Sequence, residues 1–389
     1  MRFVLLQEEP YLPTYSGAPK ANRRLLEELA RRGHACLAVC AAHHTDTSPA
    51  ALEAAMAARG IELRRVSSWL CQLTFRGVAV DGLSTGDLAR RSAWIGGRIA
   101  ERSPDLVLVA DDPRRYLLAA ALAAAPERVV FVIHHHRHLP FGPLAARRDA
   151  EQTARLHHVR AVLVMSRYSR DYVARHAGLT ALRVALPVDG PEPVPHLGAA
   201  DNRFVTLVKP IADKGVSLFL ALADRFPEVE LAAVPTWGSS PDAIQLAALQ
   251  ARRNVHLLPP ADDIGDVLKQ TRVLLVPSLF PETFGLLVPE AMARGVPVLA
   301  SNAGALDEAK LGVDFMLPVR PMTDASGRVP PQDARPWAAT LDLLLSSTRV
   351  WERCSRLSRE AGLAHLARTR IEDCEELFGR LAEEATAPI

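Results

Sequence analysis

Lysine is scarce in this 389-residue chain, which has five lysines against 41 arginines. Cysteine is also scarce: the five cysteines are an odd number and form no CxxC pair. This pattern argues against a disulfide framework and against a structural zinc site. No apolar run is long enough to span a bilayer. The first run meets Glu8 and Glu9 too early for a signal peptide, so we expect a cytoplasmic protein.

Three nucleotide-binding or hydrolase signatures are missing as well. No G-x-G-x-x-G follows any strand-like segment, and this disfavours a dinucleotide dehydrogenase. The absence of GxxxxGK[ST] disfavours a P-loop NTPase, and the absence of GxSxG disfavours an esterase-type nucleophile.

The net charge of +2 conceals an uneven distribution. Residues 1–190 hold 26 Lys and Arg against 18 Asp and Glu, a net of +8, and the remainder holds 20 against 26, a net of −6. The basic half suits an anionic partner or peripheral contact with a membrane, or it is simply solvated. The bias is too weak to indicate a nucleic-acid partner.

Strand-like and helix-like segments alternate along the chain, which predicts an α/β protein built from doubly wound parallel sheets. The alternation stops in the Pro- and Gly-rich stretch "PVDGPEPVPHLGAADN" and then restarts. We therefore predict a first Rossmann-like domain over 1–188, a linker over 189–202 and a second such domain over 203–365. The closing helical segment, 366–389, is predicted to pack back on the first domain. Ligands of such sheets bind beyond the carboxyl ends of the strands.

Two of the five lysines lie in "KPIADKG", at the end of the second domain's first strand. Lys209 and Lys214 place two ammonium groups near a helix entry at Gly215, an arrangement that suits a diphosphate. The plain alternative is a pair of solvated loop lysines.

The stretch "PETFGLLVPEAMARG" follows a buried strand of the same domain. Gly285, Leu286 and Leu287 precede the predicted helix, so their amides would face a phosphate. Glu290 in the first turn suits a ribose diol, and Glu282 suits the hydroxyls of a sugar beyond the phosphates. The alternatives are helix-dipole stabilisation for Glu290 and a solvated loop acid for Glu282.

In the first domain, Gly17 lets the backbone approach a ligand closely at a strand–helix turn. The stretch "FVIHHHRHLPFGP" ends a buried strand, and His134 and His136 would share a face if that strand continued. The preferred interpretation is that His134 hydrogen-bonds or polarises a substrate. A metal site and ordinary loop histidines are the alternatives, and no carboxylate or cysteine completes a metal set at a recognised spacing.

The motif "ETFGLLVPE" resembles the E-x7-E motif of the retaining glycosyltransferase family 4, the group 1 glycosyltransferases. "KPIADKG" resembles the diphosphate loop of that family, and "LLEELARRGHACLAV", "VVFVIH" and "VLVMSRYSRDYV" resemble segments of its first domain. The resemblance implies the GT-B architecture, in which two Rossmann-like domains face a cleft.

The resemblance also implies roles for named residues. Lys209 and Lys214 would neutralise the diphosphate of a nucleotide-sugar donor, and Glu290 would hold its ribose. Glu282 would hold the donor sugar together with the amides of Phe284, Gly285, Leu286 and Leu287. Gly17 would lie under the phosphates, and His134 near the sugar and the acceptor. The resemblance implies no metal and no cofactor besides the nucleotide-sugar co-substrate, with retention of anomeric configuration.

The predicted function is therefore hexosyl transfer to a small-molecule or lipid-linked hydroxyl, in bacterial natural-product or envelope-glycan synthesis. A non-catalytic sugar-nucleotide-binding subunit and an epimerase of the same architecture are the alternatives. Three departures from the family pattern stand out: Lys209 replaces Arg or Asn, "SGA" replaces paired glycines, and Ala305 replaces a glycine. The "HHHRH" segment is also unusual and is a candidate for acceptor recognition. The donor, the acceptor, the linkage and the oligomeric state stay open.

Overall fold

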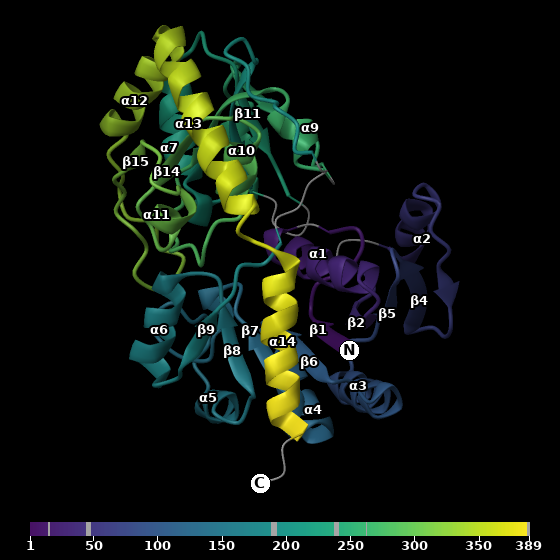
Figure 1. Cartoon of the computed structure of the whole chain (residues 1–389). Helices are drawn as coiled ribbons and strands as arrows, with labels where there is room; N and C mark the ends of the chain where they lie inside the picture. The colour runs from purple at the N-terminus through teal and green to yellow at the C-terminus, as the bar shows by residue number, and fades with distance from the viewer. Residues whose placement is uncertain (15, 44–47, 188–192, 237–240, 262, 387–389) are drawn as a thin grey trace. The chain divides into compact units, whose positions relative to one another are not determined.

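The computed structural model describes residues 1–14, 16–43, 48–187, 193–236, 241–261 and 263–386 (Figure 1). The chain forms two compact units, one of residues 1–187 with 369–389 and the other of residues 188–368. Residues 188–192, which include the first part of the predicted linker, lie outside the described residues.

The first unit contains a nine-stranded sheet in the order β3-β4-β5-β2-β1-β6-β7-β8-β9. Its strands are β1 (Arg2–Gln7), β2 (Ala35–Ala41), β3 (Arg64–Arg65), β4 (Leu70–Phe75), β5 (Val78–Leu83), β6 (Leu106–Ala110), β7 (Val129–Val132), β8 (Ala161–Val164) and β9 (Ala181–Arg183). Every residue of β6 and β7 is buried. Alternate residues of a strand face opposite sides of a sheet, so both faces of these strands are covered.

The prediction of a purely parallel sheet is wrong at one edge of this unit. β4 pairs antiparallel with both β3 and β5, whereas β5 pairs parallel with β2. The sequence analysis missed the β4–β5 hairpin, whose turn is Arg76–Gly77 with φ of 48° and 81°. Two consecutive residues with positive φ give the tight turn that joins antiparallel strands.

The helical segments of the first unit are α1 (Gly17–Arg31), α2 (Pro49–Ala57), α3 (Leu88–Arg102), α4 (Leu117–Ala124), α5 (Ala150–Leu156), α6 (Arg167–Ala177) and α14 (Ile371–Thr386), with 3-10 turns η1 (Pro126–Arg128) and η2 (His136–His138). The C-terminal helix α14 packs against the strands of this unit (Figure 1). The ring of Phe378 lies 5.5 Å from that of Phe3, and Arg32 of α1 pairs with Glu372 and Glu375. The last helix is thus part of the first unit's core.

The second unit contains a six-stranded sheet in the order β12-β11-β10-β13-β14-β15, and every pair is parallel. Its strands are β10 (Phe204–Val208), β11 (Leu231–Val234), β12 (Val255–Leu257), β13 (Thr271–Val276), β14 (Val298–Ser301) and β15 (Met316–Leu317). Its helical segments are η3 (Ala212–Lys214), α7 (Val216–Arg225), α8 (Ala243–Gln250), α9 (Gly265–Leu268), α10 (Leu287–Ala293), α11 (Leu306–Ala309), α12 (Arg335–Ser346) and α13 (Thr348–Leu366). This is the predicted doubly wound pattern.

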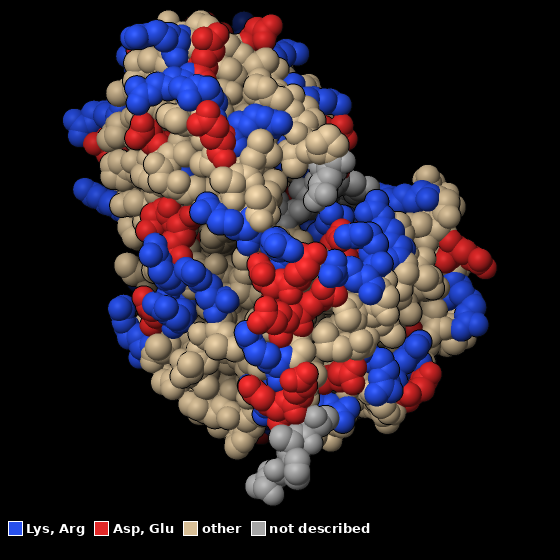
Figure 2. All heavy atoms as spheres, in the orientation of Figure 1, with Lys and Arg blue, Asp and Glu red and all other residues tan. Residues whose placement is uncertain are grey.

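The surface charges of the first unit are mixed in sign on the face drawn in Figure 2, where acidic side chains of α14 lie beside basic ones over α1. Within the described residues, no helix combines the length and the apolar character needed to cross a membrane.

We predict that Gly304→Ala lowers the melting temperature strongly. Gly304 has φ of +70°, and an added Cβ would lie 2.3 Å from the carbonyl oxygen and 2.4 Å from the nitrogen of Glu282. Gly312→Ala is the matched control, because Gly312 has φ of +79° but no atom within 4 Å of an added Cβ. Both variants carry backbone strain, but only Gly304→Ala adds a steric clash. We therefore expect Gly304→Ala to lower the free energy of unfolding by at least about 2 kcal/mol more than Gly312→Ala does. Equal melting temperatures would contradict this close approach.

Candidate functional site

The two lysines of "KPIADKG" follow β10 at the carboxyl edge of the second sheet. Lys209 has φ of 62°, and its N–H donates to the carbonyl of Val234 at 2.8 Å. Lys214 ends η3, and Gly215 then begins the turn into α7. An added Cβ on Gly215 would lie 2.1 Å from the carbonyl oxygen of Pro277. This close approach fixes the lysine loop against the segment that follows β13.

Lys214 forms an ion pair with Glu282, a contact that the sequence analysis did not anticipate. The Ser278 hydroxyl donates to Oε1 of the same carboxylate at 2.6 Å. Burial acts to raise the pKa of Glu282. The charge and hydrogen bond of Lys214, with Ser278 and Lys209, outweigh that effect and leave the pKa below its ordinary value. Glu282 is therefore a carboxylate at neutral pH.

The backbone of Glu282 is held by the loop after β14. Its N–H donates to the carbonyl of Ala303 at 3.3 Å, and its carbonyl accepts from the N–H of Ala305 at 2.9 Å. Ser301 also donates to the carbonyl of Ser278 at 2.7 Å. Ala305, which stands where the family pattern has a glycine, thus lies in a loop that is hydrogen-bonded directly to the backbone of Glu282.

The turn before α10 differs slightly from its predicted form. Leu287 is the first residue of the helix rather than a residue preceding it, and Leu286 is the N-cap. Gly285 has φ of 91°, and an added Cβ would meet Leu306 Cδ2 at 2.7 Å. In the described part of the chain, no recorded bond uses the amides of Gly285, Leu286 or Leu287, whereas Val288 already donates to Gly285.

Two further predicted residues belong to this region. Phe284 is buried, and its ring stacks 5.8 Å from that of His365. Glu290 lies in the first turn of α10, is partly exposed, and its N–H donates to the carbonyl of Leu286 at 3.2 Å. The structure thus gathers Lys209, Lys214, Glu282 and the start of α10 at one edge of the second sheet.

In the first unit, β7 ends at Val132, and His134 lies beyond it. His134 is buried, and its Nε2 is 2.8 Å from Oδ1 of Asn22 in α1. Because that oxygen only accepts, Nε2 carries the proton. Asn22 in turn donates to Gln7 at 3.0 Å. A chain of side-chain amides therefore fixes the orientation of His134.

His134 and His136 do not share a face of a strand, because β7 ends at Val132 and η2 begins at His136. His136 is fully buried and stacks on Tyr172 with ring centroids 4.5 Å apart. His138 instead contacts Asp111, whose Oδ2 lies 3.0 Å from its Nδ1. The three histidines have different neighbours, and the described residues contain no metal-binding group of three His, Cys, Asp or Glu.

Gly17 is the first residue of α1 and is exposed. An added Cβ would meet no atom within 4 Å, so packing within the described residues does not require a glycine there. Its predicted role beneath a ligand's phosphates stays a prediction.

Sequence reasoning assigned no role to three polar residues that organise these regions: Ser278, Asn22 and Asp111. Ser278 and Asp111 each follow the carboxyl end of a buried strand, a signal that could have identified them. Asn22 lies within α1, where nothing in the sequence distinguishes it from a solvated helix residue.

Residues 204–350 match the family described as Glycosyl transferases group 1. The second unit carries a group 1 glycosyltransferase domain. This domain contains β10 through α12 together with Lys209, Lys214, Glu282 and Glu290.

Two curated relatives are similar in sequence to part of this chain. D-inositol 3-phosphate glycosyltransferase of Rhodococcus jostii is 38% identical over 118 residues, which are 27% of this chain and 26% of the relative. MMP alpha-(1->4)-mannosyltransferase of Mycolicibacterium hassiacum is 32% identical over 177 residues, 44% of this chain and 41% of the relative. The chain thus spans between about a quarter and two fifths of these relatives' lengths.

Solved structures extend the similarity of fold to the whole chain. Sucrose-phosphate synthase from Thermosynechococcus elongatus has a TM-score of 0.71 at 17% identity and covers 98% of each chain. HepE of Anabaena in complex with UDP and glucose has a TM-score of 0.67 at 16% identity and covers 99% of this chain and all of the other. The chain has the GT-B fold, with a mixed sheet in the first domain and a parallel sheet in the second.

We predict that Lys214→Met lowers the melting temperature at pH 7.5 by leaving the buried carboxylate of Glu282 without its counter-charge. The side chains are 27% and 15% exposed, so we expect a cost of roughly 2 kcal/mol, between the values for exposed and fully buried pairs. The pKa of Glu282 is lowered in the folded state, so the pair stabilises the fold above the ordinary pKa near 4.5 and less as pH falls below it. The difference in melting temperature between the wild type and Lys214→Met should therefore be smaller near pH 4 than at pH 7.5.

Lys269→Met is the control for this measurement, because Lys269 pairs with Asp266 on the surface, with side chains 56% and 63% exposed. Equal melting temperatures for the two variants at pH 7.5 would show that the Lys214–Glu282 pair does not stabilise the fold.

His134 and His138 should titrate on opposite sides of the ordinary histidine pKa of 6.5. Burial lowers the pKa of His134 and outweighs the nearby charge of Asp111. Burial also acts to lower the pKa of His138, but its hydrogen bond and ion pair with Asp111 raise it overall. Ring-nitrogen NMR, with His134→Gln and His138→Gln for assignment, measures both values. A higher pKa for His134 than for His138 would refute the assignment of these environments.

Proposed function

We propose that the protein is a retaining glycosyltransferase that moves a sugar from a nucleotide-diphosphate sugar to an acceptor hydroxyl. The observation that carries the proposal is the Lys214–Glu282 pair, with Lys209 beside it, at the carboxyl edge of a group 1 glycosyltransferase domain. Open α/β sheets bind ligands at this edge. Both curated relatives are named as sugar transferases, and the structure of HepE holds UDP and glucose.

The proposed roles follow from charge. Lys209 and Lys214 lie against the donor diphosphate and stabilise the negative charge that develops on the leaving group. The amides of Gly285 to Leu287 donate to the same phosphates. Glu290 accepts hydrogen bonds from the ribose diol, and Glu282, with Phe284 beside it, accepts from hydroxyls of the donor sugar. Two lysines carry out the charge neutralisation, so the proposed reaction needs no metal ion and no further cofactor.

The proposed chemical step occurs on one face of the sugar. The acceptor oxygen forms a bond to the anomeric carbon as the bond from that carbon to the phosphate oxygen breaks. The leaving phosphate oxygen takes the acceptor's proton, so no separate base is required. His134, which is neutral and fixed by Asn22, hydrogen-bonds the donor sugar, and Gly17 admits the phosphates to the start of α1.

The acceptor is proposed to be a small-molecule or lipid-linked hydroxyl in bacterial natural-product or envelope-glycan synthesis, and the reaction to occur in the cytoplasm. Peripheral contact of the basic first domain with a membrane suits a lipid-linked acceptor.

A thermal-shift panel tests donor binding with UDP, GDP, dTDP, ADP and their common sugar forms. We expect one nucleotide to raise the melting temperature of the wild type, since a ligand that binds only the folded state stabilises it. Glu290→Ala should lose most of this shift, whereas Glu360→Ala, whose side chain is 61% exposed, should keep it. A wild type that responds to none of these compounds would contradict the proposed donor class.

A further inference from the structure

The chain of hydrogen bonds that ends at His134 begins at two backbone carbonyls. Gln7 is the last residue of β1, and its Nε2 donates to the carbonyls of Glu9 at 2.8 Å and Pro10 at 3.4 Å. A carbonyl oxygen only accepts hydrogen bonds, so the amide nitrogen of Gln7 must face these two groups and its Oε1 must face the other way. The backbone therefore fixes the orientation of the Gln7 amide.

The same constraint passes through Asn22 to the His134 ring. Asn22 of α1 donates from Nδ2 to Gln7 Oε1 at 3.0 Å, and its Oδ1 lies 2.8 Å from His134 Nε2. Because Oδ1 is an acceptor, Nε2 is the protonated nitrogen. The two carbonyls at the start of the chain thus decide which nitrogen of His134 carries the proton.

Burial leaves this chain of side chains no second arrangement. Gln7 and Asn22 are each 3% exposed and His134 is 6% exposed. The other neutral tautomer would place the lone pair of Nε2 against Asn22 Oδ1, which is costly at a buried site. Turning the Asn22 amide would remove that conflict, but it would place the amide oxygens of Asn22 and Gln7 against each other.

The His134 ring is neutral at neutral pH. Burial lowers its pKa, the charge of Asp111 acts to raise it and the charge of His138 acts to lower it, and together they leave it below the ordinary value of 6.5. Asn22 and Gln7, which hold the ring from α1 and β1, carry no charge. A neutral imidazole has one proton, so with that proton on Nε2 the other nitrogen, Nδ1, is an acceptor.

Asp111 holds the backbone of the same residue. The N–H of His134 donates to Asp111 Oδ1 at 3.0 Å, and Oδ2 of Asp111 lies 3.0 Å from His138 Nδ1. Asp111 has φ of 50°, a conformation that residues other than glycine rarely adopt and that its surroundings must maintain. His134 is thus anchored by Asp111 through its backbone and by Asn22 through its ring.

We propose that Gln7 and Asn22 are positioning residues that hold His134 as a hydrogen-bond acceptor, so that its Nδ1 accepts from a hydroxyl of the donor sugar. This inference rests on the proposed function and gives the direction of the hydrogen bond that His134 makes there. A ring held in this tautomer has no proton to donate from Nδ1, and its Nε2 proton is bound to Asn22. His134 is therefore not a proton donor in the transfer step.

Nitrogen NMR of the imidazole rings tests the tautomer in the 389-residue chain without any ligand. The wild type should show a protonated Nε2 and a lone pair on Nδ1 for the signals that disappear in His134→Gln. Asn22→Leu keeps the size of the side chain and removes its amide, so it should give a mixture of both tautomers.

Binding measurements test the positioning role. The ligands are the nucleotide sugar that stabilises the wild type and the corresponding nucleoside diphosphate, which lacks the sugar. Asn22→Leu should weaken binding of the nucleotide sugar by about fivefold or more, the size expected for one lost hydrogen bond, and change binding of the diphosphate by less than about twofold. A purely structural role would leave the ratio of the two affinities unchanged.

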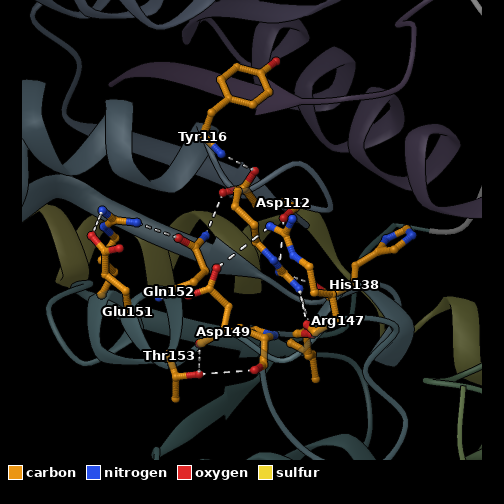
Figure 3. Close-up of polar contacts among 12 residues, drawn as sticks. Asp112, Tyr116, His138, Arg147, Asp149, Glu151, Gln152 and Thr153 are labelled. Carbon is orange, nitrogen blue, oxygen red and sulfur yellow. Dashed lines mark hydrogen bonds and ion pairs between the residues drawn. The ribbon is translucent and has the colours of Figure 1, made fainter. Parts of the chain in front are cut away.

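Gln152→Met is the matched control, because Gln152 is a buried amide of the same unit. Its Nε2 donates to Asp112 Oδ2 at 2.7 Å, a contact drawn in Figure 3, and Asp112 also accepts from the amide of Tyr116 at 3.1 Å. These bonds support the start of α4 rather than His134. Gln152→Met should lower the melting temperature, as Asn22→Leu does, without changing the ratio of the two affinities.

Asn22→Asp separates an acceptor from a donor role for His134. The carboxylate still accepts from Nε2–H, but its charge stabilises the imidazolium, in which Nδ1 is protonated and accepts nothing. The kcat/KM of Asn22→Asp relative to the wild type should therefore rise by about tenfold or more from pH 6 to pH 8, as the ring loses its Nδ1 proton. Asn22→Leu should show no such recovery.

Each outcome has one meaning. A wild type that binds no nucleotide sugar overturns the proposed function, whereas the NMR result still tests the tautomer. A lone pair on Nε2 of wild-type His134 overturns the network. An unchanged affinity ratio in Asn22→Leu overturns the positioning role. An Asn22→Asp variant at least as active as the wild type at pH 6 shows that His134 donates, and this overturns the acceptor role even if Asn22→Leu does not fold.

Discussion

The ion pair between Lys214 and Glu282 is the interaction on which the candidate donor region depends. It connects the loop after β10 with the segment after β13, and Ser278 adds a third contact to the same carboxylate. A carboxylate this buried is stable only with partners, and the lysines supply opposite charge. In the proposed complex these lysines face the diphosphate of the donor. The Lys214–Glu282 ion pair therefore holds the two loops of this anion-binding site together before a donor binds.

The sequence predicted the second domain more completely than the first. Its strands are apolar runs of a purely parallel sheet, and its candidate donor-binding residues lie in two short motifs. In the first domain the sequence did not reveal the β4–β5 hairpin, because β4 reads "LCQLTF" with no strict alternation. β4 lies next to the two-residue edge strand β3 and is mostly only partly buried, so its hydrophobic pattern is weak.

The candidate site shows the same limit. The sequence placed Lys209 at a strand end, Lys214 and Glu282 in loops and Glu290 in the first turn of a helix. The structure brings these residues to one edge of one sheet. Spacing could not reveal that Lys214 and Glu282 bond to each other, because their contact spans 68 positions in the chain. Nor could it separate the histidines of "HHHRH", whose orientations depend on where β7 stops and on partners in α1 and after β6.

The central claim is that this site transfers a sugar with retention of configuration. The most direct measurement is proton NMR of the anomeric centre during a reaction of the 389-residue chain with an α-linked nucleotide sugar and an acceptor alcohol. The account predicts an α-glycoside that appears as nucleotide diphosphate is released. A β-glycoside, or a nucleotide sugar whose anomeric signal never changes although the protein binds it, would contradict the account.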